Sequence, residues 1–186
     1  MTIIYSNYLD DDCLILQEMW KGLYNVNLIE ITPSSKNYED HIDKAISKEK
    51  DTLICCGHGT SYGLLFPNME KGEYLIHENN VHLINARRVI FSWCYAASFA
   101  LKFPELHCFA TSMFISNEKE AADNMIFEYS QDQINSNSRR FDKEINWLLK
   151  KNVPLDEWIM RLDAHMDVEN AIDVFNSNVC IINNFI

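Results

Sequence analysis

The sequence predicts an α/β protein built as a three-layer αβα sandwich with a mainly parallel central sheet. Short apolar segments with the character of strands alternate along the chain with amphipathic segments of helical spacing. Two of the apolar segments, 51–56 and 89–93, are almost unbroken, which is typical of strands that helices cover on both faces. Parallel strands that alternate with helices place those helices on both faces of the sheet.

Hydrophobic spacing defines the other elements. A strand is expected where a short apolar run lies between breaks, and a helix where apolar residues recur every three or four positions. The acidic residues at 10–12 and Pro154 suit the starts of two helices. In chain order these rules predict strand 2–8, helix 11–23, strand 27–32, helix 38–50, strand 51–56, a hairpin at 64–78, a short helix or turn at 79–86, strand 89–93, a helix ending near residue 102, strand 107–115, helix 118–131 capped by Ser116, a polar connection at 135–138, helices 141–150 and 154–166, and strand 176–183.

The length and composition favour one domain. The chain has 186 residues, of which 47% are hydrophobic and 12% aromatic, enough for one sizeable core. We expect a single domain over 1–186, with its functional motifs in a core of about 50–130. The segment 139–186 is expected to add a helical hairpin and a last strand.

The charge balance argues against two classes of partner. The chain carries 16 Lys and Arg against 27 Asp and Glu, a net charge of −11, which disfavours binding to nucleic acid or to anionic lipid. No apolar run is long enough for a membrane helix, and the N-terminus lacks the basic flank of an export signal. The six cysteines show no disulfide-framework spacing, so reduced thiols in a cytoplasmic protein are expected.

Two strands end in residues that can react. The strand 51–56 leads into Gly57-His58-Gly59, and the strand 89–93 leads into Cys94. If the strands are parallel neighbours, both ends lie at one edge of the sheet, where ligands bind in α/β folds. His58 would act as general base and acid for a Cys94 nucleophile, while the amides of Gly59 and Cys94 form an oxyanion hole.

This arrangement resembles the caspase-like cysteine peptidases, a group that holds caspases, metacaspases, clostripain, gingipains, separases and the bacterial CHAT proteins. The residues that carry the resemblance are His58-Gly59 and Cys94, each after a buried strand, within about 50–130. It implies a caspase-like αβα sandwich that hydrolyses peptide bonds in a protein or peptide substrate, without a cofactor. Ser92 and Thr60 are candidates for the substrate pocket. Many members that cleave after Arg or Lys have Asp where this chain has Ser92, which leaves the preferred substrate residue open.

Other interpretations compete with this one. His58 could be a turn histidine and Cys94 a buried structural thiol, which would make the chain an inactive relative that binds a protein partner or a second copy of itself. The segment 92–96 also loosely resembles a nucleophile elbow, so an esterase of the α/β-hydrolase type would need Asp156 or Asp163 with His165. No metal is expected, because Cys55 and Cys56 are consecutive in a strand and point to opposite faces.

Overall fold

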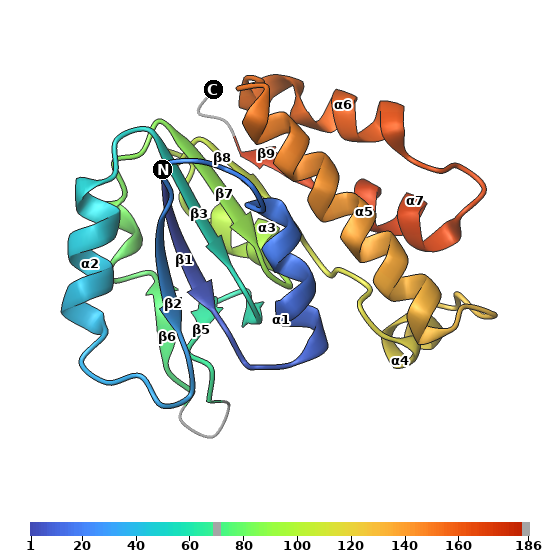
Figure 1. Cartoon of the computed structure of the whole chain (residues 1–186), viewed down its shortest axis with the longest axis horizontal. Helices are drawn as coiled ribbons and strands as arrows, with labels where there is room; N and C mark the ends of the chain where they lie inside the picture. Colours follow the sequence, from blue (N-terminus) through green and yellow to red (C-terminus); the bar gives the residue numbers. More distant parts are fainter. Residues whose placement is uncertain (69–71, 184–186) are drawn as a thin grey trace.

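A computed structural model, which describes residues 1–68 and 72–183, shows the α/β architecture directly. Its centre is a six-stranded sheet of order β2-β1-β3-β7-β8-β9, and a smaller antiparallel sheet has the order β4-β5-β6 (Figure 1). Within the large sheet every pair is parallel except β8 with β9. The predicted α/β class with a mainly parallel central sheet is therefore confirmed.

The strands are short and largely buried. Those of the large sheet are β1 (Thr2–Ser6), β2 (Asn27–Ile31), β3 (Thr52–Cys56), β7 (Arg88–Ser92), β8 (Cys108–Ala110) and β9 (Ile181–Asn183). Those of the small sheet are β4 (Gly59–Thr60), β5 (Gly63–Leu65) and β6 (Tyr74–His77), which fall in and just before the segment predicted as a hairpin. Residues 69–71, within that segment, lie outside the described residues, as do residues 184–186 of the predicted C-terminal unit.

Helices cover both faces of the large sheet (Figure 1). Their bounds are α1 (Asp11–Leu16), α2 (Glu39–Lys48), α3 (Ala96–Ala100), α4 (Glu118–Asp123), α5 (Gln131–Lys150), α6 (Trp158–His165) and α7 (Ala171–Asn178), with short 3-10 turns at Gln17–Met19, Val81–Leu83 and Leu155–Glu157. One face packs on α1, α5 and α6, and the other on α2, α3 and the small sheet. Within the described part of the chain, no helix has the length and apolar character needed to cross a membrane.

Two cores form because successive strand residues point to opposite faces of the sheet. In β3, Ile54 and Cys56 belong to the core under α1, α5 and α6, whereas Leu53 and Cys55 belong to the core under α2 and α3. Both sets are fully buried. The two consecutive cysteines therefore lie on opposite faces of the sheet, as predicted.

The longest helix differs from the prediction. Residues 135–138, expected to be a polar connection, lie inside α5. Ser130 and Gln133 form a capping box that starts this helix. Ile134 and Ser138 belong to the same buried stripe as Phe141, so the polar residues between them occupy the solvent side of one continuous helix.

Several other boundaries also shift. The strand predicted at 107–115 contains only β8, and Asn117 rather than Ser116 accepts the capping hydrogen bond of α4. The helix predicted at 11–23 ends at Leu16 and continues as one 3-10 turn. Residues 176–178, predicted as strand, form the end of α7, a helix that the sequence interpretation missed.

The strand order opens a crevice at the carboxyl ends of β1 and β3. After β1 the chain turns to α1 on one face, and after β3 it turns to the small sheet on the other. Neighbouring strands whose connections leave toward opposite faces create the position where α/β proteins bind ligands. The loops after β1, β3 and β7 therefore meet at one place.

The glycine after His58 has a packing role. The Trp93 indole lies against Gly59, and its Nε1 donates a hydrogen bond to the Thr60 carbonyl oxygen over 3.1 Å. A methyl group at residue 59 would overlap that ring. We therefore expect Gly59→Ala to lower the free energy of unfolding by about 1–3 kcal/mol in urea titrations. Ser61→Ala, whose hydroxyl makes no hydrogen bond within the described residues, is the control; equal effects would contradict the packing role.

Candidate active site

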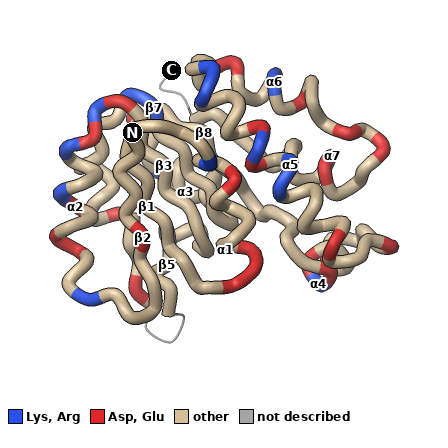
Figure 2. Tube along the Cα trace, viewed as in Figure 1, with Lys and Arg blue, Asp and Glu red and all other residues tan. Residues whose placement is uncertain are grey.

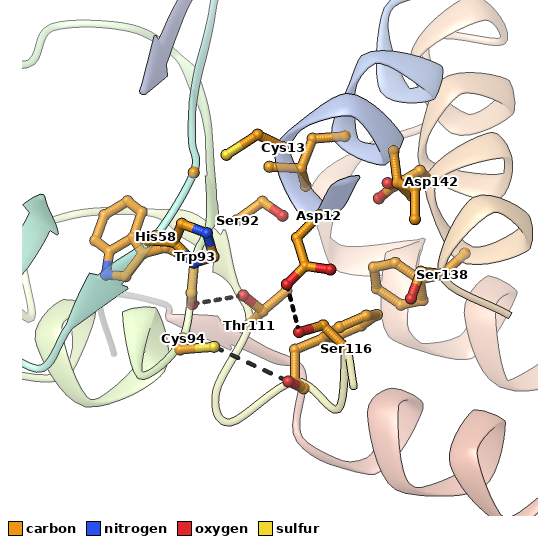
Figure 3. Close-up of a pocket in the computed structure, with 15 residues that line it drawn as sticks. Asp12, Cys13, His58, Ser92, Trp93, Cys94, Thr111, Ser116, Ser138 and Asp142 are labelled. Atoms are coloured by element: carbon orange, nitrogen blue, oxygen red, sulfur yellow. Dashed lines mark hydrogen bonds between the residues drawn. The ribbon is translucent and has the colours of Figure 1, made fainter. Parts of the chain in front are cut away.

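The register between β3 and β7 brings the predicted pair to one edge of the sheet. The strands pair in parallel with Cys56 opposite Ser92, so the residues that follow each strand leave at the same end. His58 comes two residues after β3, and Cys94 comes two residues after β7. Both side chains line one pocket (Figure 3). The imidazole and the thiol that the sequence singles out therefore share one pocket.

A glycine makes the turn that carries His58. Gly57 has a φ of +141°, a conformation that favours glycine, and a Cβ there would lie 2.6 Å from the Ser6 carbonyl oxygen. Its amide donates a hydrogen bond to the Ser92 carbonyl oxygen over 3.2 Å. The chain can therefore pass close to the end of β1 as it leaves β3. It still keeps a backbone hydrogen bond to the end of β7.

The aspartate that caps α1 also orients the imidazole. His58 Nε2 lies 2.7 Å from Asp10 Oδ2, and the Tyr8 ring meets the imidazole edge to face with 4.7 Å between centroids. The other Asp10 oxygen accepts the Cys13 amide and caps α1. Burial alone would raise the pKa of Asp10, but the hydrogen bonds from Cys13 and His58 outweigh it and lower that pKa. An ionised carboxylate can only accept this hydrogen bond, so Nε2–H is the donor, and Nδ1 is the ring nitrogen in position to act as a base.

Cys94 is the accessible thiol of the chain. It is half-buried, whereas the other five cysteines are buried. Its Sγ lies 3.9 Å from the Phe114 carbonyl oxygen, and no hydrogen bond joins it to His58. Burial, together with the negative charges of Glu120 and Asp12, raises the thiol pKa above its ordinary 9.0. The free protein therefore holds a neutral thiol, which needs a base at the moment of reaction.

The backbone around Cys94 makes a sharp turn. Tyr95 has a left-handed φ of +66° and stands at the start of α3. Non-glycine residues in this conformation carry strain, which is often found at functional sites. The Ala96 amide donates to the Trp93 carbonyl oxygen, but the Cys94 amide donates to no other described residue. An unpaired amide beside the thiol is available to a developing oxyanion.

The pocket extends from this pair to the opposite wall formed by α1 and α5 (Figure 3). Its cavity volume is about 70 Å³. The lining comprises Asp12, Cys13, Ile15, Leu16, Gly57, His58, Ser92, Trp93, Cys94, Thr111, Phe114, Ser116, Ser138, Phe141 and Asp142. Most of the accessible lining is apolar, with a few polar groups directed into it, as in many small-ligand sites.

Acidic groups form the polar part of the far wall. Asp12 Oδ2 accepts a hydrogen bond from the Ser116 hydroxyl over 2.8 Å, and Glu120 lies 3.1 Å from the same hydroxyl. Burial raises the pKa of Asp12, and the charges of Asp10 and Glu120 add to that effect. From α5, Asp142 is 3% exposed and forms no hydrogen bond or ion pair with any described residue. The hydroxyl of Ser138, one turn earlier, is buried without a partner.

The site agrees with the sequence expectation in some residues and not in others. Ser92 lines the pocket as expected, whereas Thr60 does not, because its hydroxyl points to Tyr74 in the small sheet. Gly59 also lies outside the lining, under Trp93. Asp10, Asp12 and Asp142 were not expected there. The acidic run after the first strand, interpreted only as a helix start, was the available signal for the first two.

Two other kinds of site find little support in the geometry. Asp10, Cys13 and His58 bring three potential metal ligands within 4.8 Å of one another. The Cys13 thiol is fully buried, and its Sγ already contacts the Tyr8 amide and the Ser6 carbonyl oxygen. None of the Asp and His residues named for an α/β-hydrolase lines the pocket, and two of them are engaged elsewhere, because His165 bonds Glu144 and Asp156 bonds His107.

Comparison with known proteins gives no match: no family model, no curated protein and no solved structure resembles the chain closely enough. The function is therefore inferred from the site's own geometry. That geometry supplies a half-buried thiol, an imidazole fixed by a carboxylate, and an unpaired amide beside the thiol. A nucleophile, a base with its orienting group, and an oxyanion donor are the parts that acyl transfer requires.

The buried carboxyl of Asp142 should make stability depend on pH. Burial raises its pKa well above 3.8, so the folded protein loses stability as the pH rises from about 4 toward the folded-state pKa. Asp142→Asn cannot ionise, so its stability relative to the parent should grow over that range by up to about 1.4 kcal/mol per pH unit. Urea unfolding at pH 5, 6 and 7 measures this difference. For the exposed Asp132→Asn the difference should stay constant, and the same constancy for Asp142→Asn would contradict the assignment.

Proposed function

We propose that the chain is a cysteine endopeptidase that hydrolyses peptide bonds in a protein substrate through His58 and Cys94. The observation that carries this proposal is the placement of both side chains in one pocket, with Asp10 bound to the imidazole on its Nε2 side. A histidine held by a carboxylate is the arrangement that prepares a general base for a nearby nucleophile. The imidazole can remove the Cys94 proton as the sulfur attacks.

The proposed reaction proceeds through a thioester. Cys94 Sγ attacks the carbonyl carbon of the scissile bond while its proton passes to His58 Nδ1. The carbonyl oxygen becomes an oxyanion that accepts a hydrogen bond from the Cys94 amide. Gly59, the other donor that the sequence suggested, lies outside the pocket lining. The C–N bond then breaks and the amine leaves with the proton from Nδ1. Water, deprotonated by the same imidazole, hydrolyses the thioester and restores the thiol.

The fold supports the same proposal. The resemblance to caspase-like peptidases rests on a buried strand before His58-Gly59 and a second before Cys94. In the structure these strands, β3 and β7, are adjacent and parallel near the middle of the large sheet. That arrangement is what the resemblance implies for a caspase-like sandwich.

Removal of the thiol tests the nucleophile. Cys94→Ala should lower kcat/KM for peptide hydrolysis by at least about 10³-fold, because no other accessible sulfur lines the pocket. The measurement is cleavage of a mixed peptide library followed by mass spectrometry. Cys180→Ala, which removes a buried thiol remote from the pocket, is the control and should retain activity. Equal cleavage by the parent and the Cys94 variant would refute the mechanism.

Asp10 is a positioning residue, and a conservative substitution isolates that role. Asparagine caps a helix as well as aspartate does, so Asp10→Asn should preserve the stability of α1. It cannot accept the Nε2 proton as a carboxylate does, so we expect kcat to fall about 10–100-fold with little change in KM. Asp11→Asn, an exposed neighbour in the same turn, is the control. A loss of stability with unchanged kcat would show that Asp10 acts only as a cap.

A second candidate is a non-catalytic protein that binds a partner through this pocket. The raised pKa of Cys94 and the lack of a hydrogen bond between its sulfur and His58 favour it. The two functions differ in whether a bound peptide is cleaved. A binding protein would retain an intact peptide equally well with or without Cys94, whereas a peptidase would release two fragments from the parent and bind the intact peptide only in the Cys94→Ala variant.

A further inference from the structure

We propose that the open edge of β2 binds an acidic, extended segment of a partner protein, which adds a strand to the large sheet. This interaction does not depend on the proposed peptidase reaction, because no residue of the surface lines the pocket that holds Cys94. Three features of the edge support it: unpaired backbone groups, a groove with an apolar floor, and basic side chains without partners.

The backbone at the edge has groups that no strand satisfies. β2 is the last strand at its end of the sheet order, and it pairs only with β1 among the described strands (Figure 1). The Asn27 amide donates to the Met1 carbonyl oxygen over 3.0 Å, so the odd-numbered residues of β2 direct their backbone groups to β1. The amide and carbonyl groups of Leu28 and Glu30 therefore point outward, where they bond no described residue.

The strand itself is regular enough to accept a neighbour. Its register with β1 continues over five residue pairs without a bulge, and its sequence contains no proline. Leu28 is 43% exposed, so the outer side of the strand is not covered. A regular, exposed edge is a template for a further strand, in which main-chain hydrogen bonds give affinity and neighbouring side chains give specificity.

A groove runs along β2 on the side of α2. Two hollows with cavity volumes of about 290 and 440 Å³ lie there, and Asn27, Ile29 and His41 line both of them. We call the two hollows together the edge groove. Ile29 forms part of its floor and belongs to the same core as Ile42 of α2. The groove therefore offers a peptide an apolar floor beside the open backbone.

Basic side chains line the edge groove. Lys44 and Lys48 lie one turn apart on α2, on the same side as His41, and Lys36 lies in the loop before the helix (Figure 2). The three lysines are exposed, and their amino groups form no ion pair or hydrogen bond with any described residue. The chain has 27 acidic residues against 16 basic ones, yet these cations are unpaired. Together they attract acidic groups to the groove.

The two acidic residues of the groove already have partners. Glu49 accepts a hydrogen bond from the Thr2 hydroxyl over 2.7 Å and lies 3.5 Å from the N-terminal amine. The Glu30 side chain alternates to the face of the sheet opposite Ile29, where it accepts a hydrogen bond from the Asn7 side-chain amide. The charge that the groove presents to a ligand is therefore positive.

Other occupants match fewer of these features. A second copy paired antiparallel through β2 would set the basic sides of two α2 helices against each other, and like charges oppose such a contact. A nucleic acid would pair with the lysines but could not continue the backbone ladder. A peptide strand with acidic side chains toward α2 and apolar ones beside Leu28 satisfies both the charges and the backbone.

A pair of peptides tests the charge. Both have about ten residues, the length of a long strand, and alternate Glu with Val or Gln with Val. Binding is measured by fluorescence anisotropy on Cys94→Ala, which keeps the peptides intact. We expect the Glu peptide to bind at least about 10-fold more tightly than the Gln peptide at low salt.

Variants locate this preference. Lys44→Glu combined with Lys48→Glu should abolish it, whereas Lys143→Glu combined with Lys151→Glu, two exposed positions at α5 on the other face of the sheet, should retain it. Equal binding of the two peptides, or a preference that survives reversal of Lys44 and Lys48, would overturn the inference.

The backbone pairing is tested separately. Leu28→Pro removes an outward amide and keeps the hydrogen bonds to β1, since edge strands tolerate proline where the amide faces solvent. It should weaken binding of the Glu peptide at least about 10-fold, and Leu28→Val should change it less than about threefold. N-methylation of either all Glu or all Val residues of the peptide should abolish binding in one case only, because alternate residues bond opposite edges of a strand. Equal binding of the two methylated peptides would refute strand addition.

Two further measurements identify a different occupant. A single-stranded oligothymidylate of the same charge that binds as tightly as the Glu peptide would show a general anion surface. Dimers in sedimentation that Leu28→Pro dissociates would assign the edge to a second copy of the chain. Either result would overturn the inference, whereas a monomer that prefers the Glu peptide to both the Gln peptide and the oligonucleotide supports it.

Discussion

The parallel pairing of β3 with β7 is the constraint on which the candidate site depends. With Cys56 opposite Ser92, both strands end at one edge, and the next residues of each strand enter the same crevice. A one-residue slip in this pairing would reverse the faces of Ile54 and Cys56 and bury the wrong side chains. The apolar cores on both faces of the sheet therefore fix the register and, through it, the placement of His58 and Cys94.

Three aspartates near the pocket have different environments and different roles. Asp10 receives hydrogen bonds from an amide and an imidazole, which keep its carboxylate ionised and orient His58. Asp12 and Asp142 lie deeper, and burial raises the pKa of both. The same residue type is thus kept ionised beside His58, whereas burial favours the neutral carboxyl at the other end of the pocket. Burial, together with the negative charges of Glu120 and Asp12, keeps the Cys94 thiol neutral in the free protein.

The sequence predicts the sheet well and places His58 and Cys94 at one edge of it, because buried parallel strands are short apolar runs and two of them end abruptly just before these residues. It does not predict the opposite wall. Asp142 lies in the buried stripe of α5, next to Phe141, but residues 135–138 had been interpreted as a break in that helix. Which helix covers which strand end depends on tertiary packing that local patterns do not contain. Thr60 lies outside the pocket lining for the same reason, since β4 turns its hydroxyl toward Tyr74 in the small sheet.

Covalent trapping of the nucleophile tests the central claim most directly. The protein would be treated with peptidyl acyloxymethyl ketones, which react with a thiolate only when a peptide occupies the site, and the modified residue would be mapped by mass spectrometry. The account predicts a single adduct on Cys94 that forms rapidly in the parent and at least about 100-fold more slowly in His58→Ala. An adduct on another thiol, or equal rates with and without the imidazole, would contradict it.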